Sequence, residues 1–121
     1  MRTTIETDNI KKAISAISET LNPVEGVIKA PFSGYIASFG AAIIQSGLIP
    51  AVIFFEDPSA NSEENRTLLI DAIVNYLDLE IPTTLSSYLL TLNNDDLFEM
   101  EDAIIEASIA IKLALRTFKK P

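Results

Sequence analysis

Apolar residues recur along most of the chain at spacings of three and four, which is the period of one face of an α-helix. The first such run follows Asp8, a good helix N-cap, and stops at Asn22-Pro23. Later runs occupy residues 62–77, 85–92 and 95–118. Ser62 is a candidate cap for the first of these later runs, and residues 93–96 open the last one. The pattern predicts an all-α fold, a compact bundle of five to seven helices forming a single domain over residues 1–121.

Residues 30–55 carry no charged side chain and are long enough on paper to cross a bilayer. Ser46-Gly47 is a plausible helix end, and Pro50 suits the first turn of a following helix. Neither of the two segments then spans about 30 Å of hydrocarbon. The pattern therefore favours a buried helical hairpin at the centre of the bundle over a membrane anchor. One face of its first helix carries large apolar side chains: Phe32, Ile36, Phe39 and Ile43. The neighbouring face carries mostly small side chains: Ala37, Gly40, Ala41 and Ile44.

The last helix is apolar on almost every side between Glu106 and Arg116. A helix of this kind is either central in a bundle or shares its outer face with a partner. Complete encirclement is hard to arrange in so small a domain, so we expect the isolated chain to self-associate or to be poorly soluble, through the apolar side of residues 104–115. The predicted protein interface is Ile105, Ile109 and Leu113. The side chains expected to be buried are Phe39, Ile43, Phe54, Ile73, Ile111 and Leu115.

The composition removes most catalytic chemistry. The chain has no cysteine and no histidine, which excludes thiolate metal sites and the commonest general base. Glycine-rich phosphate loops and the common hydrolase motifs are also missing. We therefore expect no enzymatic activity, no catalytic residues and no cofactor. Residues 1–9 are polar, so we expect no signal peptide and a cytoplasmic protein.

Acidic side chains gather at the start of the last helix. Glu99, Asp102 and Glu106 fall on one helix face, and their oxygens are of the kind that Mg²⁺ or Ca²⁺ binds. A solvated acidic helix start explains the same residues without any ligand, so no metal site is expected. A metal-dependent enzyme built on this face is the weakest of the alternatives.

The basic residues form two small groups. Lys112, Arg116, Lys119 and Lys120 put cations along one face of the final helix, the geometry of a stripe that follows phosphates. Cations in a last turn also complement the helix dipole and solubilise an apolar helix. Lys11 and Lys12 form a second patch on the first helix. These six residues are the candidate RNA contacts, although a net charge of −8 speaks against general nucleic-acid binding.

Two stretches carry a family resemblance. The stretch YIASFGAAIIQSGLIPAVIFF, residues 35–55, resembles the signature of the small helical subunit of type III-B CRISPR effector complexes, the fifth protein of the Cmr set. In that family a tyrosine opens a helix, a polar-Gly-Leu break follows, and a second apolar-aromatic helix comes next. The stretch ASIAIKLALRTFKK, residues 107–120, is similar to the closing helix of the family.

The resemblance implies a non-catalytic all-α subunit that serves antiviral defence. Its copies would stack along the effector complex, contact other subunits and help to hold the guide RNA–target RNA duplex through weak backbone contacts. Neither a membrane nor a small-molecule substrate is implied. The alternative is an unrelated helical adaptor that binds only protein and has no nucleic-acid role.

Overall fold

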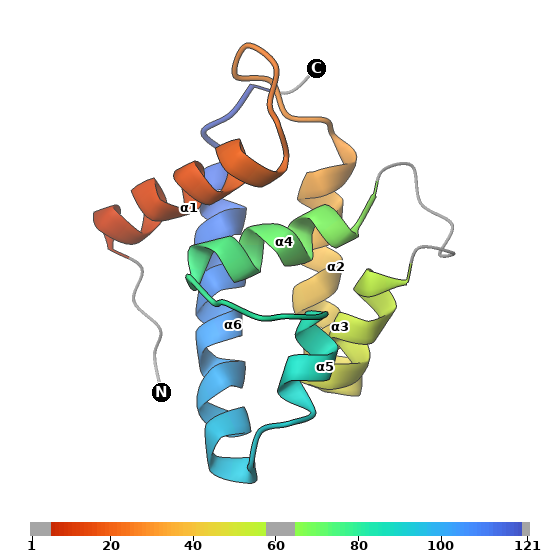
Figure 1. Ribbon diagram of the computed structural model, residues 1–121. Helices are drawn as coiled ribbons and strands as arrows, with labels where there is room; N and C mark the ends of the chain where they lie inside the picture. The colour runs from red at the N-terminus through yellow and green to blue at the C-terminus, as the bar shows by residue number, and fades with distance from the viewer. Residues whose placement is uncertain (1–5, 58–64, 120–121) are drawn as a thin grey trace.

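The computed structural model describes residues 6–57 and 65–119, and its regular structure in these ranges is helical apart from two isolated β-bridges (Figure 1). This arrangement confirms the predicted all-α fold. The helices are α1 (Thr7–Thr20), α2 (Pro31–Ser46), α3 (Leu48–Glu56), α4 (Thr67–Tyr76), α5 (Leu85–Leu89) and α6 (Asn94–Leu115).

Helix α4 crosses in front of the two longest helices, α2 and α6, which run side by side in opposite directions (Figure 1). It packs against α1, α2, α3 and α6. The hairpin does not lie at the centre of the bundle as predicted, because its outer side meets solvent, with Ile44 87% and Ile53 49% exposed. The helices α2 and α3 form one side of the bundle. Helix α4 is the one on which several other helices pack.

The break between α2 and α3 lies at Gly47, as predicted. Its backbone has φ 94° and ψ 166°, a conformation that is essentially limited to glycine. The Gly47 N–H donates to the Ile43 carbonyl at 2.9 Å and ends α2. Pro50 then lies in the first turn of α3, and that helix closes at Glu56.

Side-chain hydrogen bonds to the backbone fix the starts of the later helices. The Asn93 Oδ1 accepts the Asp96 N–H at 2.8 Å, which confirms the predicted opening of α6. The Asn65 Oδ1 accepts the Thr67 N–H at 3.0 Å at the start of α4, whereas the predicted cap Ser62 lies outside the described residues. Asp8 is not the N-cap of α1, because the helix begins one residue earlier and Asp8 lies in its first turn.

The core confirms five of the six large side chains that we expected to be buried. The exception is Phe54, which is 54% exposed, while its neighbour Phe55 is buried with its ring centroid 5.1 Å from that of Phe39. Consecutive helical residues point about 100° apart, so only one of the two phenylalanines faces inward. The outward ring is covered by the Arg66 guanidinium, which lies 4.1 Å from its centroid.

The uncharged hairpin is buried on one side only, which corrects the expectation of a buried hairpin. Its large face is covered as predicted, but Ile44 is 87% exposed and Ile53 is 49% exposed. The small face of α2 therefore meets solvent, because α3, α4 and α6 all pack on the other side. Within the described residues, no helix is long and apolar enough to cross a membrane.

We expect Phe39→Ala or Ile111→Ala to lower the free energy of unfolding by about 3 kcal/mol, because each leaves a cavity in a closed core. Both side chains have no exposed surface. Urea denaturation monitored by circular dichroism measures the change. Ile44→Ala is the control and should change stability by less than about 0.5 kcal/mol. Equal losses for the buried and exposed positions would contradict this core.

We expect Gly34→Ala to raise the free energy of unfolding by about 0.5–1 kcal/mol, because alanine loses less backbone entropy in a helix. Gly34 lies inside α2, and a Cβ there would meet no atom within 4 Å. Thermal denaturation checks the gain. The matched change Gly47→Ala should instead lower the free energy of unfolding by about 1–3 kcal/mol, because alanine is strained at the positive φ of this residue. Stabilisation by both changes would contradict the backbone conformation at Gly47.

Candidate functional site

Backbone hydrogen bonds join the connection between α1 and α2 to the C-terminal segment. The Lys119 N–H donates to the Gly26 carbonyl at 2.8 Å, and the Ile28 N–H donates to the Lys119 carbonyl at 2.9 Å. These bonds place Lys29 and Lys119 at the end of the molecule where α6 finishes (Figure 1). We call this the basic end, and its exposed cations are Lys29, Lys112, Arg116 and Lys119.

Lys112 and Arg116 border a cavity of about 190 Å³ between α2 and α6. Ser33 and Ile36 line its other side, and Leu115 also contributes. Lys112 is on the last turn of α6 and Arg116 is its C-cap, so both side chains complement the helix dipole. The cavity is small, and the two cations stand at its border.

The predicted stripe of cations along one helix is only partly right. Helix α6 ends at Leu115, and Lys119 lies beyond it in a segment paired with residues 26–28. The Thr117 N–H and Oγ1 both donate to the Ala114 carbonyl, at 2.9 and 2.7 Å, which closes the last turn and ends the helix. Lys120 lies outside the described residues. The structure thus replaces a helical stripe with a cluster drawn from two segments.

Lys29 is the residue that the sequence prediction missed. It belongs to the connection before α2, far along the chain from the other cations. No local pattern marks it, because its proximity to Lys119 depends on tertiary hydrogen bonds between the two segments.

The second predicted patch, Lys11 and Lys12, lies on a different part of the surface. The Lys12 Nζ is 4.9 Å from the centroid of the Tyr76 ring on α4. Beside it the Asn9 Nδ2 donates to the Glu106 Oε1 at 3.0 Å, joining α1 to α6. Burial raises the pKa of Tyr76; Asn9 lowers this pKa and Glu106 raises it further. Both lysines are exposed, and Lys12 also contributes to the contact between α1 and α4 through the Tyr76 ring.

The outer face of α6 carries the predicted interface residues. Ile109 is 36% exposed, and Ile105 and Leu113 are partly buried. Phe98, one turn into the helix, is 69% exposed. The opposite side of α6 is covered by α1, α2 and α4, so the apolar surface that remains is a strip along one side. The buried side is formed by Ile104, Ala107, Ala110, Ile111, Ala114 and Leu115.

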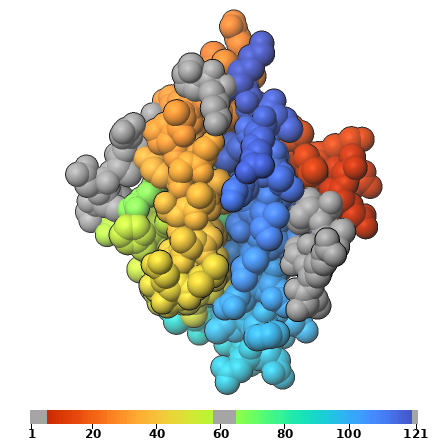
Figure 2. Space-filling view, turned by 180° about the vertical axis from the view of Figure 1, so that it is seen from behind, coloured from red at the N-terminus to blue at the C-terminus, as the bar shows by residue number. Residues whose placement is uncertain are grey.

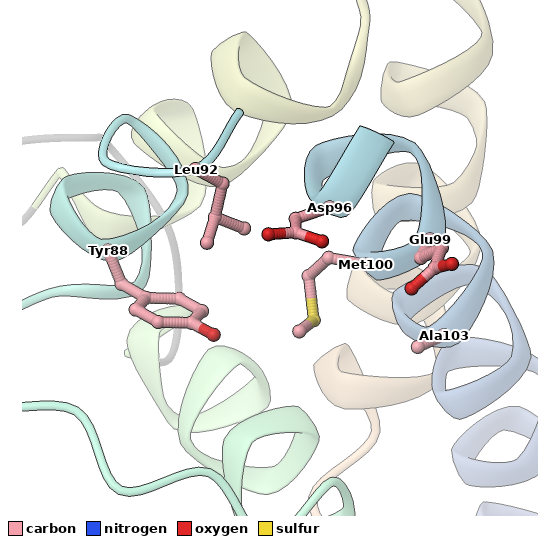
Figure 3. A pocket seen from close by; sticks show the side chains of 6 residues that line it. All are labelled: Tyr88, Leu92, Asp96, Glu99, Met100 and Ala103. Atoms are coloured by element: carbon pink, nitrogen blue, oxygen red, sulfur yellow. The ribbon is translucent and has the colours of Figure 1, made fainter. Parts of the chain in front are cut away.

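A second hollow, of about 390 Å³, lies between α5 and the start of α6 (Figure 3). The Tyr88 ring, Leu92 and Met100 supply its apolar lining, and the Asp96 carboxylate projects into it (Figure 3). The predicted acidic face does not form a metal centre: among the described residues, no three acidic side chains are grouped to hold an ion. Of the three residues of the predicted acidic face, Glu106 already accepts a hydrogen bond from the Asn9 Nδ2.

A polar clamp joins α3 and α5, beside Asp71 of α4. The Glu56 carboxylate accepts the Ser86 Oγ at 2.5 Å and the Ser86 N–H at 3.4 Å. Asp71 lies beside Glu56 along a cavity of about 270 Å³. Partial burial raises the pKa of Asp71, and the nearby charge of Glu56 raises it further. The clamp holds helices together and offers no paired nucleophile and base.

We expect Asp71→Asn to raise the free energy of unfolding at pH 7 by on the order of 0.5 kcal/mol, a small effect because water screens this carboxylate. A raised pKa in the folded state means that the ionised carboxylate disfavours folding. The penalty is present above the folded pKa and disappears as the pH falls to the ordinary value of 3.8. Urea denaturation of both proteins at pH 7 and near pH 4 should show the difference shrinking. A difference that grows in acid would contradict the direction of the shift.

A family model described as CRISPR-associated protein (Cas_Cmr5) matches residues 5–115, which is nearly the whole chain. Comparison with curated proteins and with solved structures gives no match. The matched region includes the hairpin, α4 and all of α6.

Proposed function

The chain belongs to the Cas_Cmr5 family of CRISPR-associated proteins, and from that premise we propose that it is the small subunit of a type III-B effector complex that targets RNA. In this role its copies stack along the complex and help to hold the duplex of guide and target RNA. The contribution is one of binding and not of catalysis. It serves antiviral defence inside the cytoplasm.

The basic end is the observation that supports RNA contact. The described chain carries an excess of acidic residues, yet four exposed cations come together at one end through tertiary hydrogen bonds. Lysine and arginine side chains on an open surface bind phosphates without reading bases. Lys112 and Arg116 border the same cavity, so two of these cations lie close enough to face one stretch of RNA backbone.

The same geometry limits the strength of the contact. Four cations against a net charge of −8 form too small a footprint to hold RNA alone at physiological salt. Stacked copies would present several basic ends along one RNA strand, and weak contacts on one strand act multivalently. An isolated copy should therefore bind RNA weakly and only at low salt.

A non-catalytic role agrees with the side chains that are present. The sequence has no histidine and no cysteine, and the polar clusters of the described residues serve as helix caps and clamps. An adaptor that binds only protein is the second candidate, and the exposed apolar strip of α6 favours it. Association with RNA distinguishes the two roles, because only the effector subunit should co-purify with a guide-bearing complex.

We expect the reversal of Lys29, Lys112, Arg116 and Lys119 to glutamate to reduce retention of target RNA by the assembled complex. The reduction should be similar for all target sequences, because phosphate contacts carry no sequence information. The slope of log affinity against log salt should fall by about one for each cation that no longer binds a phosphate. Filter binding over a salt series measures both quantities, and circular dichroism checks that the fold is intact.

Reversal of Lys11 and Lys12 tests the second patch in the same assay, and Lys120→Glu tests the remaining predicted cation. If the basic end carries the contact, these changes should have the smaller effect. Unchanged retention after the fourfold reversal would reduce the role of the subunit to that of a protein scaffold.

A further inference from the structure

Helices α2 and α6 form the middle of the back of the molecule, with α1 and α4 at its edges (Figure 2). The two helices lie side by side along this face, with α2 in orange and yellow and α6 in blue (Figure 2). Ile44 on α2 and Phe98 on α6 are 87% and 69% exposed. Ala37 and Ala41 of α2 are also exposed, Ile109 of α6 is 36% exposed, and Ile105 is partly buried.

This face is chemically suited to burial. Apolar area removed from water contributes roughly 25 cal/mol per Å². The small residues of α2 also leave room: a Cβ added at Gly34 or Gly40 would meet no atom within 4 Å. A helix from another molecule can therefore approach α2 closely and lie along α6.

Opposite charges lie at the two ends of the outer face of α6. At about 100° per residue, Phe98, Ile105, Ile109, Lys112 and Arg116 fall within an arc of about 60°, and Asp95 and Asp102 lie directly beside it. All the charged members of this set are exposed. Acidic residues thus occupy the first half of the strip, cations occupy the second half, and isoleucines lie between them.

We propose that in the free protein a second copy of this chain covers the face, with its α6 antiparallel to the first. A parallel pair would set acid against acid and base against base. An antiparallel pair related by a two-fold axis brings opposite charges together at both ends, and such an interface is self-complementary.

In one register, the residues of the strip meet complementary residues of the second copy. With the axis midway between residues 105 and 109, Ile105 of each copy meets Ile109 of the other. In the same register Asp102 meets Lys112, and Phe98 meets Arg116, a pairing in which the guanidinium lies against an aromatic ring. The charged pairs fix the orientation, and the apolar centre supplies the contact area.

The pairing has a consequence that rests on the proposed function. Lys112 and Arg116 are both part of the basic end, so the contacts with the second copy occupy cations that are proposed to bind RNA. Self-pairing and RNA contact then exclude each other. A free copy keeps its cations covered until it is incorporated into a complex.

A charge swap on the full chain tests the pairing. Asp102→Lys sets lysine against lysine at both symmetric positions, and Lys112→Asp sets aspartate against aspartate. Each variant alone should dimerise about tenfold or more weakly than the unaltered chain, because close charge pairs couple strongly across interfaces. An equal mixture of the two should dimerise again, since both pairs are then complementary. Sedimentation equilibrium measures all three samples.

Two control variants accompany the swap. Glu80→Lys makes the same change of net charge as Asp102→Lys at an exposed position between α4 and α5 and should leave dimerisation unchanged. Ile109→Lys should give a folded monomer, because this side chain is partly exposed and its charge reaches water in the separated copy. Circular dichroism verifies the fold of each variant.

Three outcomes would overturn the pairing: an unaltered chain that is monomeric at high concentration, single variants that dimerise as well as it does, or a mixture that stays monomeric. The proposed function fails in a different experiment, the retention of target RNA by the complex. Asp102→Lys leaves every cation of the basic end in place. If the mixture of variants dimerises again while reversal of the basic end leaves RNA retention unchanged, the pairing stands and the RNA role is removed.

Discussion

The constraint that shapes this protein is a last helix with apolar residues on almost every side. A domain of 121 residues has only a few helices with which to cover it. Helices α1, α2 and α4 cover most of the surface of α6 and create the core. The strip that stays uncovered, with Phe98 and Ile109 on it, is the remainder of the same apolar surface. Stability and the capacity for association therefore have a common origin.

The sequence predicted the helices well because their signals are local. Apolar spacing, the Asn93 cap and the glycine break at residue 47 all act within a few residues of the structure they determine. The prediction failed where the outcome depended on which side of a helix its neighbours cover. Phe54 and Phe55 are chemically identical, and only the packing of α3 on Phe39 selects the second one for burial.

The candidate site was less predictable than the fold. Lys112 and Arg116 follow from helical spacing, and both lie at the basic end. Lys29 and the true position of Lys119 do not follow from it, because hydrogen bonds between residues 26–28 and Lys119 define them. The acidic start of α6 could be identified in the sequence, but whether its carboxylates converge on one point depends on tertiary structure. Glu106 turns to Asn9 instead.

The bonds between residues 26–28 and Lys119 also bear on the order of folding. Contacts between segments far apart in sequence require a large loop to close, so they form late compared with helical hairpins. The hairpin and the packing of α6 need only residues up to Leu115. The packing of α1 on α6 closes a loop of similar length, so these terminal bonds and that part of the core carry the same kind of entropic cost. A chain cut after Leu115 would keep α1 to α6 and would lose Arg116 and Lys119, so only Lys29 and Lys112 of the basic end would remain.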